Sequence, residues 1–363
     1  MRCELLSLRN FKCHKKLTLP LSGLTVLTGF NSAGKSSVHQ ALALLAQRNS
    51  RGGLQLNGEL LNLGVMGDVL NSGTGDEGLE IGVGTTEGNI SWRFSGGRRS
   101  VVLEPEQTIE ASSAIRKSIT KFLRDMVYLT TERPAVTKLW PITQEDAQLR
   151  IGSNGDGSVP MLYALDQFPV TPSLCIDGVP PTLPRQVEAK MGEFFPGFAM
   201  DIQPAPGTNN VLSLGLRTSD KGEFHNPANV GYGLLYLLPI ITALLHTKPG
   251  HLLIIETPEA HIHPSAQSLM GMFLARVAAT GVQIIVETHS DHLINGIRRA
   301  VKSNLLAHED VIIHFFSGQR DATTKSDSVL IDTKGNLGDW PAGFCDQYDQ
   351  DLADLTGWGT PTK

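Results

Sequence analysis

The chain has 363 residues, of which 40% are hydrophobic and 18% are charged, and its formal net charge at pH 7 is −5. A chain of this length can form two or three domains, or one large α/β domain with insertions. The composition is that of an ordinary globular protein. The negative net charge does not indicate a general nucleic-acid binder, although it does not exclude a local basic patch.

The cysteines and the apolar segments indicate a cytoplasmic location. The four cysteines are scattered without a Cys-x-x-Cys pair, which argues against a zinc ribbon or a disulfide framework and fits a reducing compartment. No signal peptide is expected, because Arg2 and Glu4 lie in a strand-like pattern. The longest apolar run, 233–245, is too short to span a bilayer. We therefore expect a soluble protein that does not bind a membrane, unless a partner tethers it.

The first fifty residues predict a hairpin, a buried strand and a helix. Residues 5–21 alternate apolar and polar side chains and are interrupted near His14, which is typical of a hairpin. The short apolar strand 24–28 leads directly into a glycine loop, and residues 36–47 place apolar side chains at near-helical spacing. A phosphate-binding loop requires this order of strand, loop and helix.

The glycine loop matches the pattern G-x-x-x-x-G-K-S. Backbone N–H groups of such a loop turn toward phosphates, and the following helix adds the partial positive charge of its N-terminus. We expect Lys35 to reach the β- and γ-phosphates as a catalytic cation and Ser36 to bind Mg²⁺. ATP and Mg²⁺ are therefore the predicted cofactors. The predicted nucleotide-binding residues of this loop are Gly29, Asn31, Ser32, Ala33, Gly34, Lys35, Ser36 and Ser37.

The rest of the chain predicts an α/β protein. Glycine-rich alternating runs across 51–120 indicate an antiparallel sheet, residues 116–126 a helix, and 127–129 a strand. Apolar runs at 252–255 and 283–286 are typical of strands in the core of a parallel sheet. Two more strands are expected between Val311 and Ile331. The predicted division is 1–130 as the N-terminal ATPase lobe, 131–228 as a helical and loop-rich insertion, 229–310 as the C-terminal ATPase lobe, and 311–363 as a β and loop extension.

Two carboxylates follow the apolar strand 252–255. Glu256 ends the strand and is predicted to hold the Mg²⁺ shell, directly or through water. Glu259 is predicted to accept a proton from the attacking water. Two groups are needed because metal binding and water activation occur at different points along the reaction axis. A solvated pair at a strand end is the alternative interpretation.

Histidines follow both apolar strands, 252–255 and 283–286. His289 lies at the end of the strand 283–286, where it could hydrogen-bond the γ-phosphate and sense hydrolysis. His261 and His263 could join Glu259, His289 and His292 in a metal site, but the segment lacks a complete ligand set and no cysteine contributes. For His263 we prefer packing or a subunit contact.

This set of residues, in this order, resembles the ABC-type ATPases of the RecF, SMC and OLD-nuclease group. It looks closest to the compact bacterial AAA-type ATPases of anti-phage defence systems. The segments that carry the resemblance, besides the loop, are 8–12, 61–64, 256–264, 287–292 and 339–344. The resemblance implies an α/β P-loop NTPase of ABC-ATPase type, with a mixed central sheet, an antiparallel β subdomain and a helical lobe.

The family also implies a signature segment that contacts the γ-phosphate of ATP on the opposite subunit. Residues 229–233 lie at the matching place, so Asn229, Gly231 and Gly233 are the implied nucleotide contacts. A helix start with flexible glycines is the alternative. The implied assembly is a head-to-tail homodimer, or a higher homo-oligomer, around ATP.

Three positions depart from the family pattern or leave it open. Many members carry aspartate at Glu256 and the water-activating glutamate at Thr257, which makes Glu259 the best remaining candidate for the base. The family's glutamine loop has two candidate positions, Gln47 and the segment 131–134.

The resemblance implies a Mg²⁺-dependent ATP-hydrolysing switch that controls a separate effector protein, in anti-phage defence. The chain shows no long coiled coil, and too few residues follow His289 for a nuclease domain. The alternative is a RecF-like DNA-repair ATPase that binds DNA directly. Its support is a small basic patch, for which a solvated surface is the simpler interpretation: Arg98, Arg99, Lys117 and Lys121. A transporter subunit and a small-molecule kinase fit the residues less well.

Overall fold

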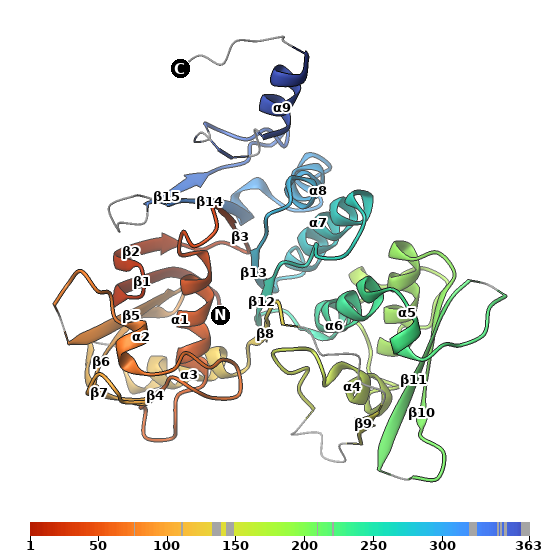
Figure 1. The fold of residues 1–363 in the computed structure, drawn as a ribbon, viewed down its shortest axis with the longest axis horizontal. Coiled ribbons are helices and arrows are strands. Elements are labelled where there is room, and N and C mark those ends of the chain that lie inside the picture. The colour runs from red at the N-terminus through yellow and green to blue at the C-terminus, as the bar shows by residue number, and fades with distance from the viewer. Residues whose placement is uncertain are drawn as a thin grey trace.

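The structure is a computed structural model, shown as a ribbon in Figure 1. It describes residues 1–75, 77–109, 112–132, 139–142, 149–208, 210–219, 221–318, 325–339, 341, 343–344 and 347–356. Within these residues the chain forms three sheets and the helices that cover them. No described helix is long and apolar enough to cross a membrane.

The first sheet forms the N-terminal lobe, at the lower left of Figure 1. Each neighbouring pair of its described strands is antiparallel, and β1 and β2 form a hairpin in which Leu8 lies opposite Leu17. Alternating apolar residues place one face of this hairpin in the core. The hairpin and the antiparallel sheet predicted from the sequence are confirmed. The strand order is β2 (His14–Pro20), β1 (Cys3–Phe11), β5 (Gly78–Thr85), β6 (Gly88–Ser95), β7 (Val102–Ile109) and β4 (Leu54–Gln55).

The second sheet is the central one, and it is mixed. Its order is β15 (Lys325–Val329), β14 (Val311–Ser317), β3 (Leu24–Gly29), β13 (Gln283–Glu287), β12 (Leu252–Glu256) and β8 (Val127–Leu129). All described neighbours pair in parallel except β15, which is antiparallel at one edge. Because parallel strands end at the same edge of a sheet, Gly29, Glu256 and Glu287 are brought to one side of the molecule.

Helices cover both faces of the central sheet, and this explains its apolar strands. Helix α1 (Lys35–Ala46) fills the space between the central and N-terminal sheets, in a core that includes Ile254 and Ile285. On the other face, a second core includes Leu253 and Ile255. The helices of this second core that lie against the sheet include α6 (Tyr232–His246), α7 (Pro264–Ala278) and α8 (Asp291–Lys302).

The segment between β8 and α6 forms a separate lobe, at the lower right of Figure 1. It contains α4 (Ser158–Ala164), α5 (Leu183–Phe194) and an antiparallel sheet in the order β10 (Phe198–Pro204), β11 (Val211–Thr218) and β9 (Trp140–Pro141). From the sequence we expected only helix and loop here. The missed signal was Leu212, Leu214 and Leu216, which alternate on β11 and are buried, while their neighbours are only partly buried.

Three further helices complete the described fold. They are α2 (Met66–Val69), α3 (Ser113–Arg124) and α9 (Gln347–Thr356), and Figure 1 shows α9 projecting beyond the sheets near the C-terminus. The Ser112 side chain caps α3 by accepting a hydrogen bond from the Ile115 N–H. Helix α3 packs against α1 and leads into β8.

Candidate functional site

The loop between β3 and α1 turns sharply at residues with positive φ. Gly29 has a φ of 127°, Ser32 of 61° and Gly34 of 94°. A Cβ at Gly34 would also lie 2.5 Å from Cys13 Sγ, so only glycine fits this position. The loop therefore runs directly into the first turn of α1, whose N–H groups have no intrahelical acceptors and form a site suited to phosphate.

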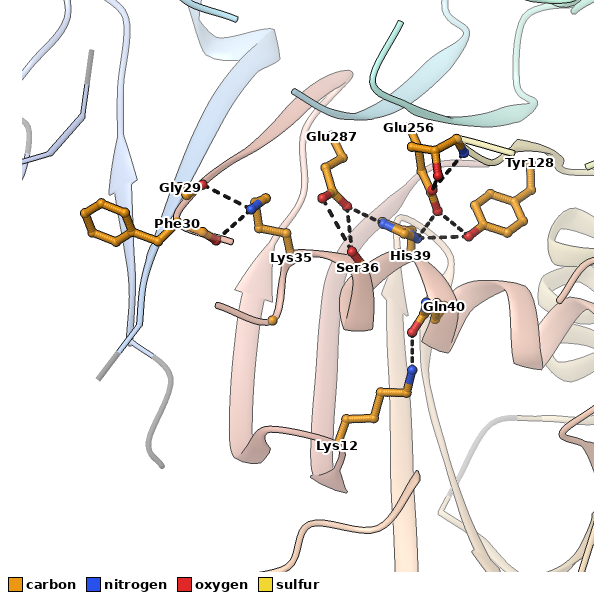
Figure 2. Close-up of polar contacts among 12 residues, drawn as sticks. Lys12, Gly29, Phe30, Lys35, Ser36, His39, Gln40, Tyr128, Glu256 and Glu287 are labelled. Atoms are coloured by element: carbon orange, nitrogen blue, oxygen red, sulfur yellow. Dashed lines mark hydrogen bonds and ion pairs between the residues drawn. The ribbon is translucent and has the colours of Figure 1, made fainter. Parts of the chain in front are cut away.

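The Lys35 ammonium lies across this loop. Its Nζ atom donates hydrogen bonds to the carbonyl oxygens of Gly29, at 3.1 Å, and Phe30, at 2.8 Å (Figure 2). Burial lowers the pKa of Lys35, and the nearby carboxylate of Glu287 opposes that shift. The charge is thus held at the mouth of the loop without a direct salt bridge to a carboxylate in the described part of the chain.

A cavity of about 360 Å³ opens at the loop. Its lining contains residues 31–37, together with Lys12 and Gln40 on one side and Glu287 and His289 on the other. The lining therefore joins the predicted phosphate loop to the end of β13. Glu256 and Glu259 are not among the described residues that line it.

Glu287 is the carboxylate nearest to the predicted magnesium ligand Ser36. The Ser36 hydroxyl donates to Glu287 Oε2 at 3.1 Å, and His39 Nε2 lies 2.6 Å from the same oxygen (Figure 2). Burial alone would raise the pKa of Glu287, but the hydrogen bonds and charges of His39, Lys35 and Ser36 hold it below its usual value. Glu287 was not among the site residues predicted from the sequence, although it ends an apolar strand just as Glu256 does.

Glu256 lies behind this pair and is connected to it through His39. Its Oε1 accepts a hydrogen bond from the Tyr128 hydroxyl at 2.5 Å and lies 3.1 Å from His39 Nδ1. Its Oε2 accepts from the Thr131 N–H at 3.0 Å. The predicted metal carboxylate therefore lies one side chain farther from Ser36 than Glu287 does. Figure 2 shows the row from Ser36 through Glu287 and His39 to Glu256 and Tyr128.

The predicted base Glu259 and the predicted sensor His289 lie together. Glu259 Oε1 accepts the backbone N–H of His289 at 2.8 Å, while Oε2 is buried without a hydrogen-bond partner among the described residues. Burial raises the pKa of Glu259, against the opposing effect of the His289 N–H. Burial and then the charge of Lys35 lower the pKa of His289, which favours a neutral ring beside the loop.

Two of the three signature residues lie on the surface at the start of α6, whereas Gly233 is buried. Asn229 and Gly231 are exposed, and a Cβ at Gly231 would meet nothing within 4 Å, whereas a Cβ at Gly233 would lie 2.5 Å from the His261 carbonyl oxygen. Packing inside the chain thus explains Gly233 but not Gly231. None of the three is among the described residues that line the cavity at Lys35.

The other histidines of the segment after β12 have structural contacts. The His261 ring lies edge-on to Tyr232 and Tyr236, with centroids 4.8 Å and 5.5 Å apart. His263 Nδ1 accepts the Ser265 N–H at 3.3 Å and caps α7. These contacts agree with the packing interpretation.

The glutamine-loop candidates have different positions. The Gln47 side chain, at the end of α1 remote from Lys35, donates to the carbonyl oxygens of Gln55 in β4 and of Leu61 in the loop that follows β4. It cannot approach a nucleotide there. Thr131 instead contacts Glu256, while Arg133 and Pro134 lie outside the described residues, as do Trp340 and Ala342 of the C-terminal segment.

Comparison with known proteins gives family matches over most of the chain. Residues 24–295 match the family described as "AAA domain, putative AbiEii toxin, Type IV TA system". Residues 306–355 match a family described as "Protein of unknown function (DUF3696)". None of the curated proteins compared with the chain matches it.

Among the solved structures with a similar fold are heads of SMC proteins. One is an SMC head bound to the C-terminal winged-helix domain of ScpA, with 14% identity and a TM-score of 0.59 over 92% of this chain and 98% of that one. Another is the SMC head domain with an extended coiled coil, bound to the C-terminal domain of ScpA from Pyrococcus furiosus. It has 12% identity and a TM-score of 0.57 over 98% of this chain and 99% of that one. The predicted fold class is confirmed.

Proposed function

Because the chain belongs to the family described as "AAA domain, putative AbiEii toxin, Type IV TA system", we propose that it is a Mg²⁺-dependent ATPase. The observation that carries the proposal is the set of side chains that line the loop cavity: Lys35 and Ser36 in the first turn of α1, and Glu287 at the end of β13. A loop of this kind followed by a helix binds a triphosphate, and the oxygen ligands beside it suit a hard cation.

Ser36 and Glu287 are the proposed magnesium ligands, and Glu256 belongs to the surrounding shell. A hydroxyl and an ionised carboxylate are the ligands that Mg²⁺ prefers, and the low pKa of Glu287 keeps its carboxylate ionised. His39 orients Glu287 and links it to Glu256. Bound magnesium would neutralise charge on the phosphates.

Lys35 would exchange its bonds to the Gly29 and Phe30 carbonyls for phosphate oxygens. The exchange is favourable because a bond between an ammonium group and a phosphate is charge-assisted on both sides.

Glu259 is the proposed acceptor of the proton of the attacking water, and His289 would transmit the state of the γ-phosphate. A carboxylate with a raised pKa is a stronger base than an ordinary one. Its contact with the His289 backbone fixes it relative to a ring that lines the cavity.

We further propose that two copies assemble head to tail around ATP and act on a separate effector protein. The exposed signature residues Asn229 and Gly231, together with Gly233, would contact the nucleotide of the partner subunit. The SMC heads of similar fold carry a bound domain of ScpA, which supports a protein partner for this chain. We propose that this action serves defence against phage; the support is the family description, which names a putative toxin of a type IV TA system.

Glu259→Gln tests the hydrolytic role. Loss of the base should reduce ATP hydrolysis by about 10²- to 10⁴-fold while ATP still binds, because the loop is untouched. Steady-state hydrolysis and titration calorimetry measure the two effects. Glu309→Gln, at a side chain that is 73% exposed, is the matched control and should hydrolyse ATP normally. Wild-type hydrolysis by Glu259→Gln would remove Glu259 from the mechanism.

Lys35→Ala tests the nucleotide site independently. The variant should bind ATP at least about tenfold more weakly, because a charge-assisted contact is lost. Unchanged affinity would show that the nucleotide binds elsewhere.

A further inference from the structure

The loop between β3 and α1, residues 29–36, is called the P-loop from here on. A second cavity lies at the opposite end of α1 from this P-loop. It has a volume of about 580 Å³ and lies between residues 48–52, which follow α1, and the exposed side of α3. Among the described lining residues, Asp125 is the only carboxylate and six are basic, a formal charge of +5 on a chain whose net charge is −5. The six are Arg48, Arg51, Arg116, Lys117, Lys121 and Arg124.

These cations have no compensating partners within the described part of the chain. No described carboxylate lies within ion-pair distance of any of the six, whereas Arg93 and Arg185 elsewhere on the surface do pair with glutamates. Burial and the charges of Arg116 and Arg124 lower the pKa of Arg48 to about 10. The cavity therefore has an unbalanced positive field, which an anion would relieve.

The scaffold of the cavity is ordered by its own contacts. Arg48 donates to Leu45 O at 3.1 Å and to Thr120 Oγ1 at 3.2 Å, and its guanidinium lies 4.2 Å from the centre of the Trp92 ring. The Asn49 side chain accepts the N–H groups of Arg51 and Gly53, which closes the turn after α1. Pre-organised cations lose less entropy when a ligand binds.

We propose that this cavity binds a compact ligand that carries several phosphate groups. Guanidinium and ammonium groups are the side chains that recognise phosphate. The described lining contains no aromatic residue and no Ala, Val, Leu, Ile or Met, so it offers no ring on which a nucleic-acid base could stack. Its volume lies in the range of small-molecule sites, about 300–1,000 Å³. The ligand would also lie at one end of the helix whose other end forms the P-loop.

The test measures binding of inorganic tripolyphosphate by calorimetry, without Mg²⁺. All proteins carry Lys35→Ala, so that the P-loop contributes little. We expect one site per chain, and at least about tenfold weaker binding when Arg116→Glu and Lys117→Glu are added, because each reversal turns attraction into repulsion. These positions lie in the first half of α3, where glutamate is compatible with the helix dipole. The control pair Arg185→Glu and Lys302→Glu changes the net charge equally at exposed positions outside the cavity and should bind normally.

Two results would overturn the proposal. One is that the cavity variant and the control variant bind tripolyphosphate equally tightly, or that neither binds it. The other is a 30-base-pair DNA duplex that binds more tightly than tripolyphosphate and is weakened by Arg98→Glu and Arg99→Glu as strongly as by the cavity pair. That result would assign the cations to an extended nucleic-acid surface. The test does not measure ATP hydrolysis. A failure of this proposal can therefore be distinguished from a failure of the proposed ATPase function.

Discussion

His39 is the residue on which the arrangement of the site depends. It lies one helical turn after Ser36, is fully buried, and its two ring nitrogens face Glu287, Tyr128 and Glu256. A histidine in this position can hold two strand-end carboxylates at a defined separation, much as outer-shell partners orient metal ligands in other proteins. We regard it as a positioning residue, because it does not line the cavity.

Replacement of His39 should change how the protein responds to Mg²⁺. For His39→Ala we expect the Mg²⁺ concentration that gives half-maximal ATP hydrolysis to rise about 10- to 100-fold, because Glu287 loses its orienting partner. His39→Gln, which keeps one hydrogen-bonding group, should recover part of the loss. Metal titrations of the ATPase rate measure both.

A buried histidine elsewhere provides the control. His314 is also fully buried and binds Pro20 O, but it lies outside the described lining of the P-loop cavity. His314→Gln should leave the Mg²⁺ dependence unchanged even if it lowers stability. An unaltered Mg²⁺ response in His39→Ala would reduce His39 to a packing role.

At the scale of elements, helices α7 and α8 pack closely against each other, and a glycine lies at each point of close contact. A Cβ at Gly271 would lie 2.1 Å from Leu293 O, and one at Gly296 would lie 2.1 Å from Ser268 O. Backbone atoms cannot move away as a flexible side chain can, so these glycines let the two helices pack against each other. Helix α8 begins directly after His289, and its packing therefore supports the strand end at which Glu287 and His289 lie.

Gly296→Ala should destabilise the protein although alanine favours helices. We expect the free energy of unfolding to fall by about 2 kcal/mol, since overpacking against backbone exceeds the gain in helix propensity. The matched control is Gly192→Ala on α5, where a Cβ would meet nothing within 4 Å. That change should raise the free energy of unfolding by up to about 1 kcal/mol. Urea unfolding of both variants gives the comparison, and equal effects would contradict the close approach of α7 and α8.

At the scale of the whole molecule, the proposed dimer would bind ATP between the P-loop of one copy and the signature residues of the other. None of the signature residues is among the described residues that line the P-loop cavity, and Gly231 has free space around it. A complete nucleotide site in the proposed assembly would therefore need the second copy.

Gly231→Asp tests this assembly. The φ of −60° at Gly231 suits any residue, so the folded monomer should tolerate the change and bind ATP normally. In the dimer the new carboxylate would face the γ-phosphate, and like-charge repulsion should weaken ATP-dependent dimerisation at least about tenfold. Light scattering of the Glu259→Gln protein, with and without the added change, measures it. Gly192→Asp adds the same charge elsewhere and should dimerise normally; equal dimerisation of both variants would exclude contact at Gly231.

Local patterns in the sequence were sufficient to predict the strand, glycine loop and helix of the P-loop segment. They also predicted the hairpin, the antiparallel sheet and the apolar strands of the central sheet. Each depends on residues close together in the chain, whose spacing determines the backbone conformation and the buried face. The order of strand, loop and helix from Leu24 to Ala46 is the clearest case.

Only the tertiary structure decided which distant side chains meet. The choice of Glu287 rather than Glu256 as the neighbour of Ser36 follows from β13 lying directly beside β3, with β12 one strand farther away. Strand order is set by long-range packing, and periodicity within a segment does not encode it. For the same reason, the position of Gln47 away from the P-loop and the cation-lined cavity between α1 and α3 could be recognised only once α3 was packed against α1.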